Sequence, residues 1–260
     1  MLRARLTVSY LGSGYHGFAA NPGVRTVAGD LTEAISKVVR APVELTGAGR
    51  TDAGVHGWGQ VISCDLPDGT DLADLAARVN KLCAPGISVR SAEWAPADFD
   101  ARRSATSRTY RYHVWNDPAP NPLLAGLTWH VPRPIDLTAA REAVAPLIGE
   151  HDFTSFCRKP KVPEGQPQPS MVRIVRSIDV RRVDDTPMLR FEVTATSFCH
   201  QMVRSLVGTL VDVGLGRLCA ADVTAALRAR DRSTAGTVAP PDGLILWSVG
   251  YDGTRWDVAR

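Results

Sequence analysis

Two hydrophobic periods alternate along this chain and restrict its fold to a mixture of strands and helices. Residues 2, 4, 6, 8 and 10 are apolar or aromatic, which is the alternation of a half-buried strand. Apolar residues then recur at helical spacing over 27–39. Further strands are expected at 43–47, 60–66, 87–94, 106–115, 171–183, 188–196 and 244–251, and helices at 71–83, 138–148, 200–213 and 221–230. This order predicts an α+β chain of two parts, 1–104 and 105–260, with mainly antiparallel sheets.

Length and cysteine usage exclude several classes of protein. A chain of 260 residues with 44% hydrophobic residues buries roughly 70–75% of its unfolded surface and builds a substantial core. The five cysteines are far apart and form no C-x-x-C pair, so reduced thiols in a cytoplasmic protein are expected rather than a disulfide framework or a zinc site. The start, MLRARLTVSY, has no apolar core of a signal peptide, and no run of about 18 apolar residues predicts a membrane span.

The stretch GAGRTDAGVHGWGQV, residues 47–61, places one carboxylate, Asp52, among five glycines and beside Arg50. Glycine lets backbone or ligand approach closely, so this composition indicates a loop that holds the acid against something. An exposed Asp in an ordinary glycine-rich turn is the alternative. His56 is expected to donate a hydrogen bond to the loop backbone.

Basic residues indicate a polyanionic partner. Only four of the 30 basic residues are lysines, and arginine suits phosphate contacts and base stacking, although a biased genome composition gives the same count. Arg102, Arg103, Arg108 and Arg111 lie in or before RTYRYHVW, interleaved with aromatic residues. This combination is typical of contacts to single-stranded or looped RNA, and an edge strand with solvated arginines is the alternative.

The segment SFCHQMVRSLVGTLVDVGLG predicts a helix with an apolar stripe and Arg204 on its flank. A partly buried arginine is usually matched by a carboxylate, so Arg204 and Asp52 are a candidate ion pair that would hold Asp52 ionised. Extension of Arg204 to solvent is the alternative.

Five blocks together carry a resemblance. GRTDAGVH, FDARRSATSRTYRY, HDFTSF, MVRSLVGTLVDVG and APPDGLIL resemble, in order and spacing, the TruA family of tRNA pseudouridine synthases over about residues 10–251. The resemblance implies an α+β pseudouridine synthase fold, in which two related ferredoxin-like halves join their sheets around an active-site cleft. It also implies a homodimer without metal or organic cofactor that acts on uridines 38 to 40 of the tRNA anticodon stem-loop.

The resemblance assigns roles to individual positions. Asp52 corresponds to the family's essential aspartate and Arg50 to an RNA contact in the same motif. Tyr110 corresponds to the tyrosine that packs against the target base, Arg204 to the arginine paired with the aspartate, and Leu244 to the leucine of the uracil pocket. Arg102 and Arg108 are further candidates for substrate binding.

The reaction explains these residue types. Pseudouridine formation breaks the C1′–N1 bond, turns the uracil, joins C5 to C1′ and removes the C5 proton. Asp52 would add covalently to the sugar or base, or deprotonate C2′; the sequence leaves both open. Tyr110 is a candidate for the final proton removal, and the target uridine is expected to leave the base stack.

The chain departs from the family pattern near its N-terminus. The family often has Y-D-G-T-x-[FY]-x-G-W-Q, whereas this chain has YLGSGYHGFA, with Leu11, Ser13, Phe18 and Ala19 at the altered positions. FDAR replaces the usual F-H-A-R, and Ile245 follows the pocket leucine where Tyr is common. Because the resemblance implies that this loop contacts RNA, these changes are expected to alter RNA positioning and substrate range more than the reaction itself.

Other function classes stay open. An RNA-binding protein with an inherited cleft but no turnover is the second function class, and a phosphodiester-cleaving enzyme is a third. Asp152 and Phe153 are interpreted as turn and core anchors, and the proline-rich stretch 158–170 as a mobile surface loop.

Overall fold

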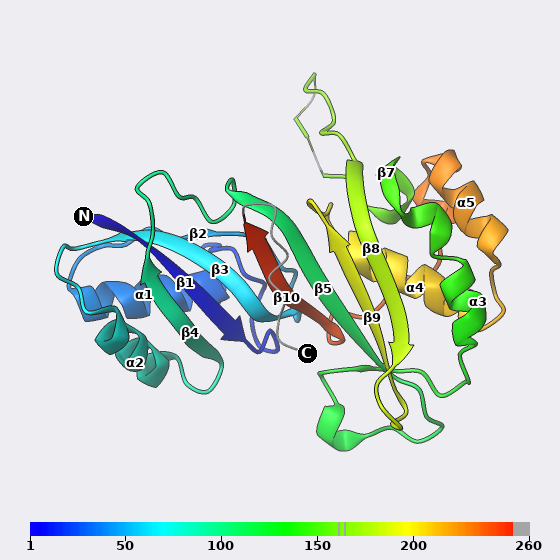
Figure 1. The fold of residues 1–260 in the computed structure, drawn as a ribbon, viewed down its shortest axis with the longest axis horizontal. Helices are drawn as coiled ribbons and strands as arrows, with labels where there is room; N and C mark the ends of the chain where they lie inside the picture. Colours follow the sequence, from blue (N-terminus) through cyan, green and yellow to red (C-terminus); the bar gives the residue numbers. More distant parts are fainter. Residues whose placement is uncertain (161, 164, 252–260) are drawn as a thin grey trace. The chain divides into compact units, whose positions relative to one another are not determined.

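In the computed structural model, which describes residues 1–160, 162–163 and 165–251, the chain forms two structural units (Figure 1). Unit 1 comprises Met1–Arg108 and the C-terminal segment from Ile245, and unit 2 comprises Thr109–Leu244. The sequence placed the division after residue 104 and the whole C-terminal strand in the second part. The strand returns to unit 1 because it hydrogen-bonds to a strand there, a long-range pairing that no local pattern encodes.

Unit 1 has the order of a ferredoxin-like βαββαβ motif. Its elements are β1 (Leu2–Tyr10), α1 (Val27–Val39), β2 (Thr46–Gly47), β3 (His56–Leu66), α2 (Leu72–Cys83) and β4 (Ile87–Trp94). The strand order is β4-β1-β3, with both neighbours of β1 antiparallel to it. Strand β2 pairs with the other edge of β3 at Ser63 and Ile62, and β10 (Leu244–Tyr251) pairs in parallel with the same edge at His56 and Gly57.

Local sequence explains these elements. The even-numbered residues of β1 from Ala4 to Tyr10 are buried, as the alternation predicted. Helix α1 starts after Thr26, whose side chain accepts a hydrogen bond from Gly29 N, and ends at Arg40 in the left-handed conformation. The core of unit 1 forms where buried residues of α1 and α2 pack on one face of the sheet.

Unit 2 contains the rest of the sheet and three α-helices. Its elements are β5 (Ala105–Trp115), which begins in unit 1, β6 (Trp129–His130), α3 (Leu137–Glu142), β7 (Gly149–Asp152), β8 (Val172–Arg182), β9 (Met188–Ala195), α4 (Met202–Gly214) and α5 (Ala220–Ala229). Short 3₁₀ turns lie at Pro122–Leu124, Ala145–Leu147, Thr154–Phe156 and Arg232–Thr234. The strand order is β5-β9-β8-β7, with β8 antiparallel to both neighbours and β6 paired to β5.

Helix α4 is the central helix of unit 2. All of its residues except Arg204 are buried, which explains why its sequence is apolar on more than one face. Gly214 permits close packing, because a Cβ there would lie 3.0 Å from the backbone oxygen of Asp136. The predicted helix over 200–213 is therefore confirmed, with its start two residues later.

Some local predictions were wrong. The expected helix over 138–148 ends at Glu142 and gives way to a 3₁₀ turn that contains Pro146, which cannot continue an α-helix. The expected strand over 43–47 is reduced to Thr46–Gly47. Of the predicted loop 158–170, the described residues lie outside helices and strands and are mostly exposed, and residues 161 and 164 are not among the described residues.

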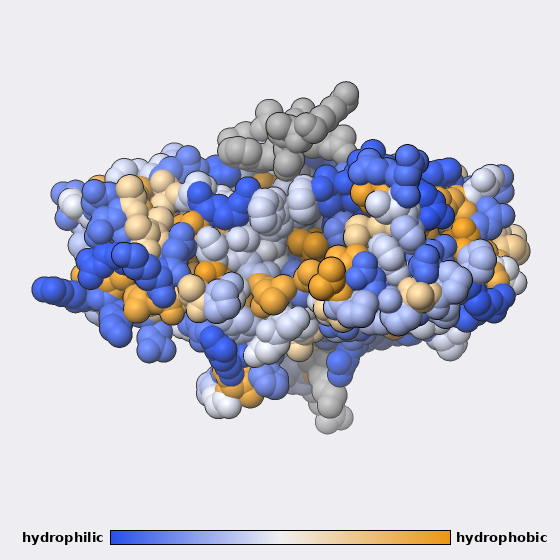
Figure 2. All heavy atoms as spheres, turned by 90° about the horizontal axis from the view of Figure 1, so that it is seen from below, coloured by the Kyte–Doolittle hydropathy of each residue, from blue (hydrophilic) through white to orange (hydrophobic). Residues whose placement is uncertain are grey.

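The predicted fold class, α+β with a mainly antiparallel sheet, is confirmed. The face in Figure 2 shows hydrophobic side chains in several separate groups among hydrophilic ones.

Within the described part of the chain, no helix has both the length and the apolar character needed to cross a membrane.

Candidate active site

The loop between β2 and β3, residues 48–55, carries Asp52 and is called the Asp52 loop below. Its first residues are fixed to β3: Ala48 N donates to Val61 O (2.8 Å), and the buried Gln60 side chain donates to Gly49 O (2.7 Å). Near its centre, the Thr51 hydroxyl hydrogen-bonds to the Tyr10 hydroxyl at 2.9 Å inside the core. Within the loop, Val55 N donates to Asp52 O (3.1 Å). The loop is therefore held at several points along its backbone.

Residues 11–19, which follow β1 and are called the N-terminal loop below, contact the Asp52 loop as well. Phe18 N donates to Thr51 O (3.1 Å). A Cβ at Gly17 would lie 2.8 Å from Thr51 O, and a Cβ at Gly12 would overlap the carbonyl group of Val55. The two loops thus touch through backbone atoms, and only glycine allows this approach at residues 12 and 17.

The exposure of the Asp52 loop differs between neighbouring residues. Thr51 and Val55 are buried, Arg50 and Ala53 are exposed, and Asp52 is intermediate. The loop therefore presents one partly exposed carboxylate from a backbone that is held by β3 and by the N-terminal loop. This arrangement differs from an ordinary glycine-rich turn, in which the backbone would be solvated.

His56 is 3% exposed and its Nδ1 accepts a hydrogen bond from Gly12 N at 2.9 Å. His56 was expected to donate a hydrogen bond to the loop backbone, but in this bond the ring nitrogen is the acceptor. Since Nδ1 is the acceptor, the neutral ring carries its proton on Nε2. His56, the first residue of β3, therefore links that strand to the N-terminal loop.

Two of the candidate RNA-binding arginines differ in their surroundings. The guanidinium of Arg108 donates to the carbonyls of Ala48 (3.0 Å), Arg102 (2.9 Å) and Ala105 (3.1 Å). Arg108 thus ties the start of the Asp52 loop to residues 102–105, whereas Arg102 is exposed. Sequence reasoning missed this structural role because the partners are backbone carbonyls.

The FDAR departure has a local explanation. The Asp100 carboxylate accepts from the backbone N–H groups of Arg102 (2.9 Å) and Arg103 (2.8 Å), as in an Asx turn. Asp100 therefore stabilises the turn that supplies one of the carbonyl partners of Arg108.

In unit 2, Tyr110 lies on β5 and is 8% exposed. Its ring packs edge-on against Phe198, with ring centroids 5.1 Å apart and an interplanar angle of 88°. Phe198 was not predicted as a site residue, and its position six residues before Arg204 in the same segment was the available signal.

Arg204, on the first turns of α4, is bonded to the segment before β10. Its Nε donates to Ala239 O (2.7 Å), while Ala239 N donates to Arg204 O (3.1 Å). The same segment is held by Tyr112, whose hydroxyl donates to Pro240 O (2.8 Å), and by Asp212, which accepts from Thr237 N (2.8 Å). Burial raises the pKa of Tyr112. The guanidinium of Arg204 is therefore oriented by backbone rather than extended freely into solvent.

Leu244 is 6% exposed and begins β10, and its N–H donates to Pro241 O (2.9 Å). The next residue, Ile245, is the Cα partner of His56 in β3. The short ladder of β10 on β3 thus starts one residue after the predicted pocket leucine.

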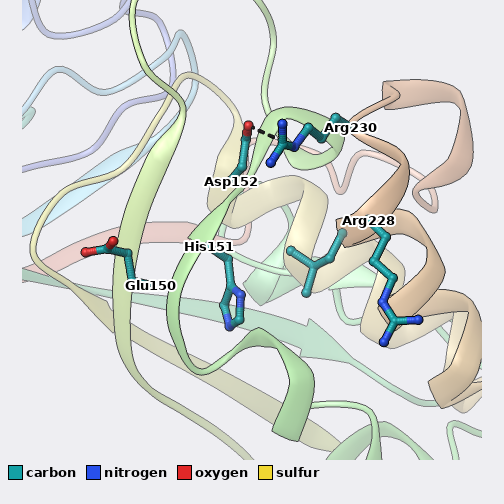
Figure 3. Close-up of a pocket in the computed structure, with 6 residues that line it drawn as sticks. Glu150, His151, Asp152, Arg228 and Arg230 are labelled. Atoms are coloured by element: carbon teal, nitrogen blue, oxygen red, sulfur yellow. Dashed lines mark ion pairs between the residues drawn. The ribbon is translucent and has the colours of Figure 1, made fainter.

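A hollow of about 500 Å³ in unit 2 is lined by Glu150, His151, Asp152, Leu227, Arg228 and Arg230 (Figure 3). Arg230 points toward Asp152 and pairs with it at 3.2 Å. Burial alone would raise the pKa of Asp152, but hydrogen bonds from Thr154 and the charge of Arg230 lower it. Asp152 and Phe153 are thus turn and core anchors, as predicted, and the hollow contains none of the predicted site residues.

Across the described residues, no group of three or more His, Cys, Asp or Glu side chains is arranged to hold a metal ion.

Comparison with known proteins agrees with the motifs. Residues 143–252 match a family model described as tRNA pseudouridine synthase. Proteins named tRNA pseudouridine synthase A from Methylacidiphilum infernorum, Frankia casuarinae and a Caulobacter species are 38%, 43% and 41% identical, and the alignments cover 95–97% of this chain and 90–99% of those proteins. A solved Cbf5-Nop10-Gar1 complex aligns with 80% of this chain and 45% of its own at 13% identity and a TM-score of 0.36, a similarity too weak to add to the argument. The sequence identity over nearly the whole chain shows that the protein belongs to the tRNA pseudouridine synthase A family.

Proposed function

We propose that this protein is an isomerase that converts uridine to pseudouridine at positions 38 to 40 of the tRNA anticodon stem-loop, with Asp52 as the catalytic nucleophile or acid. Family membership supports pseudouridine formation in tRNA. The observation that carries the role of Asp52 is its loop, which is fixed through Ala48, Gly49 and Thr51 while the carboxylate stays at the surface.

A fixed loop suits this reaction. The C1′–N1 bond breaks, the uracil turns, the C5–C1′ bond forms and the C5 proton leaves, so no net oxidation occurs and no group is lost. The carboxylate must stay aligned with a base that changes its orientation, and displacements of about 1 Å can cost about 100-fold in rate. The backbone hydrogen bonds and glycine contacts of the Asp52 loop support this proposal, because they would oppose such displacements.

We propose three supporting residues for the same reaction. Tyr110 would pack against the target uracil, and its edge-to-face contact with Phe198 would fix the orientation of its ring. Arg204 would pair with Asp52; the bond from its Nε to Ala239 O limits the orientations that its guanidinium can take. Leu244 would supply an apolar wall for the detached base.

RNA binding is proposed to involve Arg50 and Arg102, which are exposed, and Arg108 to a smaller degree, because its guanidinium already holds three carbonyls. The target uridine would leave the base stack at a cost of a few kcal/mol. Since phosphate contacts release counterions, tRNA affinity should fall as salt rises.

The decisive experiment measures tritium release from C5 of uridine-labelled tRNA transcript under single-turnover conditions. Wild type, Asp52→Asn and the control Asp68→Asn are compared, since Asp68 is an exposed carboxylate in the same unit. Release by wild type and Asp68→Asn, with none by Asp52→Asn, supports the proposal. If no protein releases tritium but all bind tRNA, the chain is an RNA-binding protein without turnover, and scission of the transcript would indicate phosphodiester cleavage.

Two further properties belong to the proposal. The protein is expected to be a homodimer, which light scattering of the purified protein tests directly, and a monomeric mass at assay concentration would contradict it. A cytoplasmic location is expected from the five cysteines without a disulfide framework, and fractionation of cells tests it.

A further inference from the structure

Two of the five cysteines form a contact that the proposed reaction does not use. Cys157 and Cys199 are 42 positions apart in sequence, yet a backbone hydrogen bond from Arg158 N to His200 O (2.9 Å) joins the residues that follow them, and each thiol shifts the pKa of the other. Cys157 is buried, and Cys199 is partly exposed. By contrast, Cys64 is buried in unit 1, and burial raises the pKa of its thiol to about 12, which makes it unreactive.

The two thiols are electrostatically different. The interaction between the two thiols lowers the pKa of Cys199 and, together with burial, raises that of Cys157. The charge of Arg173 favours a thiolate at both positions, and Asp152 opposes it. Among the described residues, Nε of Arg173 is buried without a hydrogen-bond partner. The same guanidinium carries the charge that lowers the pKa of Cys199.

A backbone hydrogen bond brings together the two segments that carry the cysteines. Arg158 N donates to His200 O at 2.9 Å, which joins the residues that directly follow the two cysteines. Cys157 N donates to Thr154 O (3.3 Å), and the Cys199 thiol has a weak contact of 3.8 Å with Met171 O. A partly exposed thiol with a buried thiol on the adjoining segment is the arrangement of an attacking and a resolving cysteine.

We propose that Cys157 and Cys199 are a redox-active pair that hydrogen peroxide converts to a reversible disulfide. The Cys199 thiolate attacks one peroxide oxygen, the O–O bond breaks, and a proton from solvent gives Cys199 sulfenic acid and water. The Cys157 thiol then attacks that sulfur, the S–OH bond breaks, and a second water leaves as the disulfide forms. Two electrons pass from the sulfurs to peroxide, and an added dithiol returns them.

The disulfide would alter the proposed active site, and this part of the inference rests on the proposed function. The two sulfurs must approach to about 2.05 Å to form the disulfide bond. Cys157 follows the fully buried Phe156, so the movement falls on the segment around Cys199. Phe198, which precedes Cys199, packs on Tyr110. Arg204 lies five positions after Cys199. Oxidation is therefore expected to slow turnover by about tenfold or more.

The first test is chemical and needs no activity. The full chain is treated with a small excess of hydrogen peroxide, alkylated and mapped by mass spectrometry. A peptide pair joined through Cys157 and Cys199 that dithiothreitol separates supports the proposal. In Cys157→Ser, a trappable sulfenic acid at Cys199 is expected, and Cys199→Ser should form neither product. Wild type that keeps both thiols while exposed Cys219 is oxidised would overturn it.

The second test measures single-turnover tritium release before and after peroxide. Wild type and the control Cys219→Ser should lose about tenfold and recover with dithiothreitol, whereas Cys199→Ser should not respond. If the reduced wild type is inactive, the proposed function fails while peptide mapping still decides the redox pair. If the mapped disulfide forms and the rate is unchanged, the proposed link to the active site is wrong.

Discussion

Replacing Gly12 by alanine should slow the reaction through backbone displacement alone. The new Cβ would lie 2.5 Å from the carbonyl carbon of Val55 and 2.8 Å from that of Gly54. Carbon atoms in contact are about 3.5–4.0 Å apart, so the two loops must separate by about 1 Å. Gly12 N would then also move away from His56 Nδ1, its acceptor at 2.9 Å.

The magnitude follows from this displacement. Overpacking of this kind costs about 1–3 kcal/mol of unfolding free energy, which corresponds to a fall in Tm of about 2–4 °C per kcal/mol for a chain of this size. A shift of about 1 Å in the Asp52 loop is expected to lower the single-turnover rate by about 100-fold. The loss of activity should therefore be much larger than the loss of folded protein at assay temperature.

Gly14→Ala is the matched control, because Gly14 lies in the same loop and a Cβ there meets nothing within 4 Å. Its φ of 85° makes alanine strained at a cost of about 1–2 kcal/mol. Both variants are compared by circular dichroism and by tritium release. A folded Gly12→Ala protein with the wild-type rate, or equal rate losses in both variants, would refute the coupling between the two loops.

Three further predictions concern the groups around the site. Burial raises the pKa of the Tyr112 and Tyr251 phenols, so the unfolded chain loses these protons at lower pH, and the unfolding free energy should fall by up to about 1.4 kcal/mol per tyrosine and pH unit above about pH 10. Chemical denaturation across that range measures it, and a flat profile would contradict the burial argument. Asp212→Ala should cost about 1–3 kcal/mol, because a buried acceptor of two hydrogen bonds is lost; an unchanged calorimetric midpoint would count against it. If Asp52 and Arg204 are paired, a double-mutant cycle of Asp52→Asn and Arg204→Gln on unfolding free energy should give a coupling of about 0.5–3 kcal/mol, and additive effects would exclude the pair.

Periodic segments could be predicted from the sequence, and segments shaped by distant contacts could not. The alternation from Leu2 to Tyr10 and the helical stripe of α1 match the structure because one face of each is buried against the same core. Strand β3 starts at His56, earlier than predicted, because Gly57 and Gly59 look like loop residues. A Cβ at Gly57 would overlap the ring of Tyr10, so this glycine makes room for a side chain of the neighbouring strand.

The candidate site shows the same limit. The motif around Asp52 identified the loop, but the sequence contained no sign that Arg108 holds Ala48 O or that Ala239 O holds Arg204. Both acceptors are backbone carbonyls, which every residue carries. Arg111 was grouped with possible RNA contacts, yet it pairs with Glu192 on the adjacent strand at 2.6 Å. Cross-strand partners depend on register, which hydrophobic patterning does not fix at this detail.

The residues of the N-terminal loop have two different physical roles. Gly12 and Gly17, which match the family pattern, are the positions where a Cβ would collide with the Asp52 loop. Among the changed positions, Phe18 is buried and fills the space beside Gly47, whereas Leu11 is 46% exposed. The departures from the family pattern therefore preserve the contacts that hold Asp52 and change side chains that can be accommodated by packing or by solvent. Differences in RNA positioning are consequently expected to arise at exposed positions such as Leu11, while the support of the carboxylate is retained.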